Sequence, residues 1–302
     1  MVAFAVRRID ISLTLGTGAL QGATENTVNF TNLRVEAQIN KPNIPGISSA
    51  HIRIYGLTLD HINQFTKAGT AYYAAWNVIT LWAGDEFSGM ATIFKGWVRY
   101  SYPDFRDPKS ASFFVDAISS GGGVIQRPRP STSFKGAVTI NQVFTTLSNN
   151  ANLSLENNGV NGTLYNPYFW GTPWQQIVRA VKAANAFAYN SQETSKLAIW
   201  PHGGNRTPNQ IYTVSPQTGM IGYPAFQDAQ VQVRTQFDPS IQAMEPGFPI
   251  QIQSDLTAAN GKWYVFDVGY MLSSQTPSGP WEMLLTAQSS KYQQPQGVGG
   301  GN

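Results

Sequence analysis

The chain has 302 residues, of which 42% are hydrophobic and 12% are charged, and its formal net charge is +3. This share of apolar side chains supports a globular fold of two or three domains, whereas the charged share is about half of the usual ~25%. The small net charge and the scattered basic residues argue against a dedicated nucleic-acid-binding protein. The absence of cysteine excludes disulfides and thiolate metal sites.

Two further features of the sequence concern targeting. The first apolar residues precede the charges of Arg7 and Arg8, which is the reverse of the order in a secretory signal. No apolar run approaches the ~20 residues that a membrane-spanning helix needs. We therefore expect a soluble protein that does not enter a membrane.

Residues 1–125 are expected to form a mostly antiparallel, barrel-like domain with one short helix. Apolar and polar residues alternate through this stretch, which is the period of a half-buried strand. The expected strands are residues 4–15, 33–39 and 51–55, followed by three runs within residues 76–119. Thr58 is suited to cap the helix, whose buried face would carry Leu59, Ile62 and Phe65.

The segment from Trp76 to Ser119 is predicted to be a three-stranded meander. In its second strand, strict alternation would place Val98, Tyr100 and Tyr102 on one face and Arg99 on the other. These residues look structural rather than catalytic.

A change of pattern separates the first domain from the next one. The glycine triplet at 121–123 and the prolines at 128 and 130 mark a boundary, because proline removes a hydrogen-bond donor from a sheet. Helical periodicity then follows Thr139, and Thr172 begins a second helix with Pro173 at its first position and Gln175 closing a capping box. With a hairpin of residues 187–189 and 197–200, residues 126–205 are predicted to form a small α+β domain.

Strand-like alternation returns over residues 206–290, which are predicted to form a second barrel-like domain. The longest expected strand would carry Tyr264, Phe266, Val268 and Tyr270 on one face. Residues 291–302 have too little apolar surface to fold alone, so this tail is either disordered or ordered by a partner. The predicted fold class is mainly β with a small α+β insert, in which two antiparallel barrel- or sandwich-like domains flank an α+β domain.

The sequence contains no recognisable catalytic or metal-binding constellation. The histidines, His51, His61 and His202, are not spaced as metal ligands are. There is no Gly-x-Ser-x-Gly elbow, and acids such as Asp85 and Asp104 fall in expected turns. We therefore expect a protein that is not an enzyme and that uses no cofactor or metal.

Aromatic residues supply the candidate contact sites. Packing in the core or between domains is one interpretation, anchoring of a protein interface is a second because Trp and Tyr carry much of the binding energy, and a sugar-binding platform is a third. The candidate interface residues, at the end of the central hairpin, before the second helix and in the tail, are Tyr100, Tyr102, Phe105, Tyr168, Phe169, Trp170, Lys291 and Tyr292.

Several short motifs carry a resemblance to a known family. Residues 50–57 (AHIRIYGL) and 93–98 (IFKGWV) lie in the first expected barrel, and residues 219–224 (GMIGYP), 260–265 (NGKWYV) and 279–282 (GPWE) lie in the second. In order and spacing, these motifs resemble the two barrel domains of baseplate hub proteins from long-tailed bacteriophages.

The resemblance implies a structural role. In that family the two barrels repeat the fold of the tail-tube subunit, so a homotrimeric ring can match the sixfold tail tube on one side and the threefold central spike on the other, around a channel for DNA passage. The implied partners are the tail tube protein, the central spike protein, other baseplate proteins and the tape measure protein. The implied location is the tail baseplate of a virion that assembles in the host cytoplasm. The alternatives are a carbohydrate-binding receptor-recognition tail protein and, third, a hydrolase of cell-wall glycan.

Overall fold

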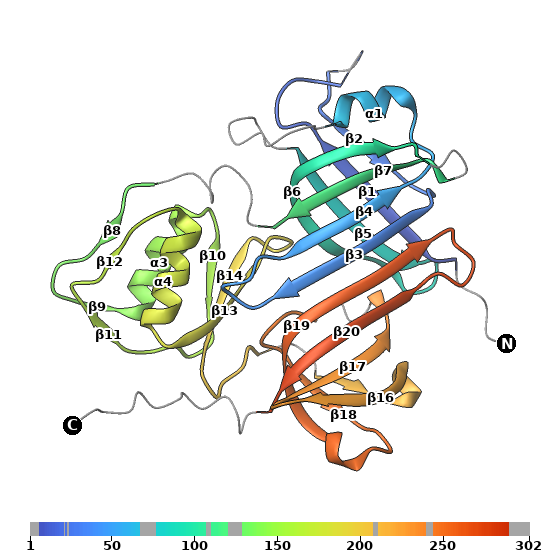
Figure 1. Ribbon diagram of the computed structural model, residues 1–302. Helices are drawn as coiled ribbons and strands as arrows, with labels where there is room; N and C mark the ends of the chain where they lie inside the picture. The colour runs from blue at the N-terminus through green and yellow to red at the C-terminus, as the bar shows by residue number, and fades with distance from the viewer. Residues whose placement is uncertain are drawn as a thin grey trace.

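A computed structural model describes residues 6–20, 22, 24–66, 77–106, 110–119, 129–207, 211–239 and 244–289 (Figure 1). Most of the assigned residues lie in β strands, and the two longest helices lie side by side in a smaller body beside the main sheet. The predicted fold class, mainly β with a small α+β insert, is confirmed. The expected boundary segment around residues 121–128 lies outside the described residues.

The N-terminal sheet unit begins the chain. Its elements are β1 (Arg8–Thr14), β2 (Thr27–Phe30), β3 (Val35–Pro42), β4 (Ser49–Ile54), α1 (Leu59–Phe65), β5 (Val78–Asp85), β6 (Gly89–Asp104) and β7 (Ser112–Ile118). Helix α1 starts as predicted, because the Thr58 side chain accepts a hydrogen bond from the backbone N–H of His61. Ile62 and Phe65 are its buried residues, whereas Leu59 is exposed.

The middle unit is the α+β insert. Its elements are β8 (Thr132–Ser133), β9 (Ala137–Thr139), α3 (Ile140–Asn150), β10 (Ser154–Asn157), β11 (Thr163–Tyr165), β12 (Tyr168–Phe169), α4 (Pro173–Ala183), β13 (Ala186–Ser191) and β14 (Lys196–Pro201). Both helices begin with capping boxes, at Thr139 with Gln142 and at Thr172 with Gln175. Their apolar faces form a separate core with the three-stranded sheet β10-β14-β13.

The C-terminal sheet unit completes the chain. Its elements are β15 (Tyr212–Val214), the 3-10 helix η2 (Pro216–Thr218), β16 (Met220–Gln227), β17 (Gln230–Gln236), β18 (Pro249–Ile252), the 3-10 helix η4 (Thr257–Ala259), β19 (Gly261–Ser274) and β20 (Trp281–Gln288).

Hydrogen bonds join the two sheet units into one continuous sheet. Strand β19 pairs antiparallel with β3 over eight residues, from Asp267 opposite Pro42 to Ser274 opposite Val35. The strand order is β16-β17-β20-β19-β3-β4-β7-β6-β5-β1-β2, with β15 and β18 branching from β19. The buried apolar residues of both units form a single core. The two sheet units therefore share one sheet and one core, a feature that the sequence did not indicate.

Bulges in the long strands shift the faces that strict alternation predicts. The β6–β7 register slips between Val98 and Tyr100, so Val98 and Ser101 are buried while Tyr100 and Tyr102 are exposed. The prediction that Val98 shares a face with the two tyrosines is wrong, because an extra residue in one strand reverses the side-chain phase that follows it.

A second bulge has the same effect in β19. The register with β20 slips between Val265 and Asp267, so Val265, Val268 and Tyr270 are buried together. Tyr264 and Phe266, predicted to lie on that buried face, are only partly buried. The bulge bends β19 and allows its first residues to pair with β18 while its later residues pair with β3.

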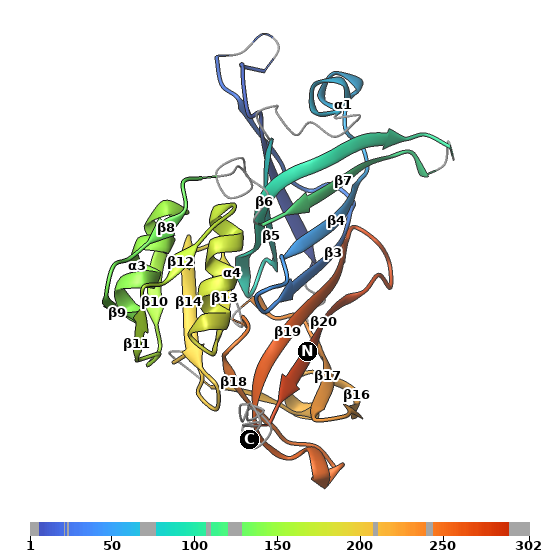
Figure 2. The same ribbon diagram turned by 60° about the vertical axis from the view of Figure 1, so that its left-hand side comes forward.

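The middle unit lies beside the sheet, next to the β3–β4 loop, in both views of the ribbon (Figures 1 and 2). The loop docks into it: the Ile44 side chain belongs to the core of the middle unit, and the Ile44 N–H donates to the carbonyl of Ala188 at 2.9 Å. The chain leaves the sheet after β7 and returns to it after β14, so the middle unit is tied to the sheet by this loop and by both connections.

Candidate functional site

One face of the joined sheet is exposed along eight consecutive strands. Cross-strand neighbours share a face of a sheet, and the register lines up Tyr100, Asp116, His51, Gln38 and Met271 across β6, β7, β4, β3 and β19. The line continues through β20 and β17 to β16. We call this the outer sheet face. The opposite face carries the apolar core, so the amphipathic alternation of these strands leaves one polar surface that spans both sheet units.

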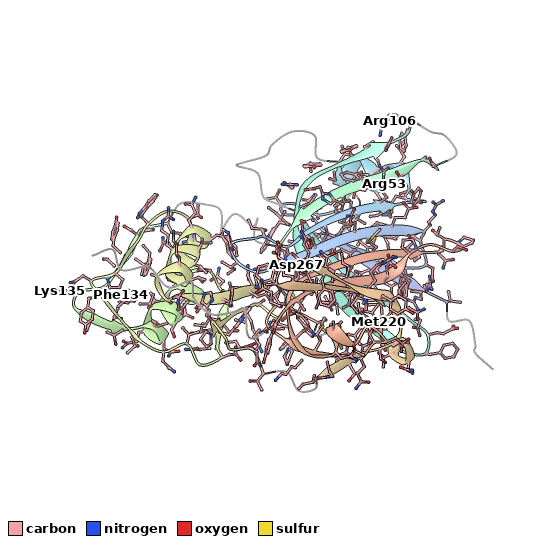
Figure 3. All side chains as sticks on the ribbon, turned by 60° about the horizontal axis from the view of Figure 1, so that its bottom comes forward. Arg53, Arg106, Phe134, Lys135, Met220 and Asp267 are labelled. Carbon is pink, nitrogen blue, oxygen red and sulfur yellow. The ribbon has the colours of Figure 1, made fainter. Side chains whose placement is uncertain are left out.

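Ion pairs within the outer sheet face neutralise most of its charge. The fully buried carboxylate of Asp116 bonds to Arg99 Nε, and its Oδ2 lies 2.9 Å from His51 Nδ1. Asp104 pairs with Arg106 at 2.8 Å and with Arg53 at 3.3 Å. These hydrogen bonds, chiefly from Arg106, hold the pKa of Asp104 well below its usual range. Figure 3 shows Arg53 and Arg106 near the same end of the sheet.

An aromatic cluster sits on the β6 end of the outer sheet face. The rings of Tyr100 and Tyr102 are stacked at 6.5 Å between centroids, and both contact the ring of Phe114 on β7. The Arg53 guanidinium lies 5.7 Å from the centre of the Phe114 ring. Phe105, just beyond the strand, is half exposed. The structure thus brings together two of the candidate interface residues, Tyr100 and Tyr102.

Strand β16, at the other end of this face, also carries exposed aromatic side chains. Strand β16 pairs only with β17 among the described strands, and its register slips between Ile221 and Ala225. Pro224 lies within this irregular stretch and blunts the open edge against indiscriminate strand pairing. Tyr223, within the irregular stretch, is 70% exposed. Phe226 is 48% exposed but pairs with the buried Val231, so it lies on the opposite side of the sheet.

The second predicted aromatic group divides between surface and core. On β12 and just after it, Tyr168 is 60% exposed and Trp170 is 54% exposed, whereas Phe169 between them is buried in the core of the middle unit. Phe169 therefore packs within the chain, because alternation along the strand turns it inward. The Arg179 guanidinium stacks 3.7 Å from the centre of the Trp170 ring. Lys291 and Tyr292 lie outside the described residues.

A buried ion pair connects β3 to the middle unit. Lys41 is 2% exposed, and its Nζ lies 2.8 Å from Glu193 Oε1 in the β13–β14 turn. Burial alone would lower the pKa of Lys41, but the carboxylate of Glu193 and the surrounding groups raise the pKa well above its ordinary value. The ammonium also lies 5.5 Å from the centre of the Tyr270 ring in β19.

A second set of buried charges extends this pair to the C-terminal sheet unit. Arg206 Nη1 lies 2.7 Å from Glu245 Oε2, and Arg206 Nε lies 2.8 Å from Glu156 Oε1 on β10. The Ser191 hydroxyl donates to Glu245 Oε1 at 2.7 Å and lies 3.4 Å from Glu193, which links the two sets. We call the six residues Lys41, Glu156, Ser191, Glu193, Arg206 and Glu245 the ionic junction.

Sequence reasoning missed the ionic junction, because its members come from positions 41 to 245 and meet only in the folded chain. One local signal was present. Val35, Ala37 and Ile39 occupy the buried phase of β3, and Lys41 continues that phase. A lysine on the apolar phase of a strand indicates a buried charge that needs a partner.

Within the described residues, no group of three or more His, Asp or Glu side chains is placed to hold a metal ion. None of the helices in that part of the chain is long and apolar enough to cross a membrane.

Comparisons with known proteins relate the fold to tail proteins. No protein-family model matches the sequence, and no curated protein matches it significantly. Among solved structures, the chain is similar to a tail protein from Neisseria meningitidis, with a TM-score of 0.62 and 8% identity over 93% of this chain and 96% of that one. It is similar to the 43 kDa tail protein of prophage MuSo2 from Shewanella oneidensis, with a TM-score of 0.61 and 9% identity over 94% and 98% of the two chains.

A third similar structure comes from a secretion system. It is an Escherichia coli component of the type VI secretion system, described as structurally similar to the tail proteins gp27 and gp5 of bacteriophage T4. The TM-score is 0.56, with 11% identity over 84% of this chain and 73% of that one. The fold of the present chain is therefore the fold of these tail proteins, as the motifs in the sequence indicated.

Proposed function

We propose that this chain is a baseplate hub subunit of a phage-type tail, which assembles as a homotrimeric ring between the sixfold tail tube and the threefold central spike. The observation that carries the proposal is the continuous sheet, which joins two sheet units through β3 and β19 and leaves one polar face open. A chain with two such units would offer the tube six modules from three copies. The shared fold with tail proteins supports the same function.

The dimensions of the sheet suit a ring around a channel. Eight strands of each chain form the outer sheet face, from β16 to β6. Strand β5 pairs with β6 only as far as Trp97, so the later half of β6 keeps an open edge among the described strands. If three copies meet with that edge beside β16 of the next copy, strands spaced by ~4.8 Å and tilted by ~40° close a ring with a backbone diameter of about 48 Å. Side chains on the inner surface then leave a channel wide enough for duplex DNA.

The chemistry of the outer sheet face also suits a channel lining. Its arginines pair with carboxylates of the same face, so passing DNA would meet few free cations. The two ends of this face carry exposed aromatic residues, Tyr102 on β6 and Tyr223 on β16, which are suited to anchor the contact between neighbouring copies. The tail tube and central spike proteins are the partners that this ring would join in the virion baseplate.

The first test is the molar mass in solution by light scattering, with negative-stain images of the same sample. We expect a trimer of about 99 kDa, which is three times 33.0 kDa, and a ring with a central hole. Tyr102→Glu and Tyr223→Glu should each shift the protein toward monomers, because each places a charge in a contact that the ring buries. Tyr165→Glu is the matched control, since Tyr165 is 76% exposed on the middle unit.

Two outcomes would contradict the proposal. One is a protein that stays monomeric even when mixed with the tube and spike proteins of its own tail. The other is a monomer that binds host-surface glycan and loses this binding on truncation of Tyr100 and Tyr102, which would favour a carbohydrate-binding receptor-recognition protein.

A further inference from the structure

The middle unit has an unusual charge balance. Residues 129–207 contain six basic and two acidic side chains, whereas the rest of the chain contains 14 basic and 15 acidic ones. Both acids of the middle unit are committed to the ionic junction, Glu156 with Arg206 and Glu193 with Lys41. Both carboxylates of this unit are thus paired with buried cations, and the unpaired charges on its surface are basic.

Five of these basic residues pair with no carboxylate among the described residues, namely Lys196 in β14 and the four considered next. Arg129 and Lys135 flank strand β8, and Arg179 and Lys182 lie one turn apart on α4. Lys135 lies at the end of the molecule that is distant from the sheet (Figure 3). The field of four unneutralised cations on a small body favours a negatively charged partner.

Exposed aromatic rings lie among these cations. Strand β8 pairs with β12, with Ser133 opposite Tyr168. Lys135 follows β8 by two residues, and Arg129 lies in the segment that leads into it. Trp170 is held by Arg179, which stacks on its ring and donates from Nη1 to its backbone carbonyl at 2.9 Å. The segment before β8 is tied to α4, because Gln176 Nε2 donates to the carbonyl of Pro130 at 3.2 Å.

These contacts make one surface from three elements. We call it the basic-aromatic patch, and its residues are Arg129, Lys135, Tyr168, Trp170, Arg179 and Lys182. Trp, Tyr and Arg are the residues that most often dominate binding energy at protein interfaces. A preformed arginine–tryptophan stack loses little conformational entropy when it binds.

We propose that the basic-aromatic patch docks a protein partner that presents carboxylates around an apolar side chain. The partner's carboxylates would pair with Lys182, Arg129 and Lys135, and its apolar group would cover the exposed part of Trp170. The proposal goes beyond the hub assignment and does not depend on it, because it concerns a surface outside the sheet and needs no trimer.

Nucleic acid fits this surface less well than an acidic protein does. Arg179 already occupies one face of the Trp170 ring, so a base cannot stack there. The four cations belong to two separate elements, the segment around β8 and helix α4. If a single-stranded nucleic acid did bind through four phosphate contacts, the logarithm of its binding constant would fall with the logarithm of the salt concentration with a slope of about −3, which the binding measurements can test.

Fluorescence anisotropy with labelled probes tests the proposal on the full-length protein. The probes are a short peptide of alternating Glu and Leu, the same peptide with Gln in place of Glu, and an oligothymidine of matched charge. We expect the Glu peptide to bind, the Gln peptide not to bind, and the oligothymidine to bind more weakly than the Glu peptide.

Variants separate the two parts of the patch. The double variant Arg179→Glu with Lys182→Glu should lower the affinity for the Glu peptide by at least about tenfold. Trp170→Ala should lower this affinity by several-fold. Lys262→Glu, an exposed cation on β19, is the matched control and should change the affinity by less than about twofold. Circular dichroism and the ionic-strength dependence are recorded for each variant.

Three outcomes would overturn the proposal. The first is no binding of the Glu peptide by the wild-type protein at low salt. The second is equal loss of binding in Lys262→Glu and in the double variant, which would show a general charge effect. The third is tighter binding of oligothymidine than of the Glu peptide with loss in the double variant, which would assign the patch to nucleic acid. Because none of these measurements depends on the oligomeric state, failure here leaves the hub proposal to its own test.

Discussion

Replacing Glu193 by Gln would leave the buried ammonium of Lys41 without its nearest counter-charge. The wild-type pair joins β3 to the middle unit at 2.8 Å, with the two side chains 3% and 10% exposed. Removing one partner of a buried pair costs about 3–5 kcal/mol of unfolding free energy, because the remaining charge is buried and unpaired.

Deprotonation of Lys41 limits this cost. Lys41 can escape the unpaired state by losing its proton, and at pH 7 this requires about 4.6 kcal/mol for an amine with an ordinary pKa of ~10.4. We therefore expect Glu193→Gln to destabilise the protein by about 3–4.5 kcal/mol at pH 7.

The pH dependence of the variant should have the opposite sign to that of the wild type. In the wild type the folded pKa of Lys41 is raised, so the stabilisation is present at neutral pH and is lost as the pH rises through that folded pKa. In Glu193→Gln the dominant effect is burial, which lowers the folded pKa below its unfolded value. The unfolded state then binds more protons, and the stability of the variant should increase from pH 7 to pH ~10.

The assay is urea unfolding followed by fluorescence at several pH values. Glu86→Gln is the control, because Glu86 is exposed in the β5–β6 turn and pairs with no described cation; it should change the unfolding free energy by less than about 0.5 kcal/mol. The double replacement Lys41→Met with Glu193→Leu should recover most of the lost stability, since two apolar groups remove both desolvation penalties. A loss below about 1 kcal/mol in Glu193→Gln, or a pH profile parallel to that of the wild type, would refute this reasoning.

Three further predictions concern other parts of the fold. Burial raises the folded pKa values of Tyr189 and Tyr270, and the folded pKa of Lys41 is raised as well. The free energy of unfolding should therefore fall steeply above pH ~10, by up to about 4 kcal/mol per pH unit if all three groups titrate together. An alkaline denaturation series in which stability stays flat to pH 11.5, about 1.5 units above the ordinary tyrosine pKa, would contradict this. Thr172→Ala should cost about 1 kcal/mol, because the Thr172 hydroxyl accepts from the Gln175 N–H at 3.2 Å and caps α4; Thr145→Ala on the exposed face of α3 should cost nothing in the same thermal melts. Gly84→Ala should cost about 1–3 kcal/mol in chemical unfolding, because its new Cβ would lie 1.8 Å from the Gly89 carbonyl oxygen across the β5–β6 hairpin; an unchanged unfolding midpoint would show that the hairpin opens freely.

Short-range chemistry explains which features could be predicted from the sequence. The capping threonines Thr58 and Thr172 act on N–H groups two or three residues away, so their helices were predictable at the correct residues. In the sequence, Trp281, Met283, Leu285 and Ala287 recur at every second position, which indicates one buried face of a strand, and all four are buried in β20. Tyr100, Tyr102 and Trp170 were candidate interface residues because of their residue type, and all three are exposed; their role in an interface stays a prediction.

Long-range pairing explains what could not be predicted. The face of the sheet on which Tyr100 lies depends on a bulge in β6 opposite β7. A bulge arises from the pairing of two strands, so one strand's sequence does not specify it. Phe169 was a candidate for either a core or an interface position, and it is buried, because β12 packs against helix α4 and Phe169 joins the core of the middle unit. The ionic junction unites residues from all three units, and no local pattern specifies which carboxylate meets Lys41.

The sequence by itself determined the local elements, the α+β character of the middle unit and its excess of basic residues, because capping, periodicity and composition are read from neighbouring positions. Only the tertiary structure decided that β3 and β19 pair, and with them that two sheet units share one core and one outer face. The physical reason is that an edge strand offers the same unpaired N–H and C=O groups to any partner. Which partner it takes is decided by the apolar surface that the pairing buries, and that surface exists only in the assembled fold.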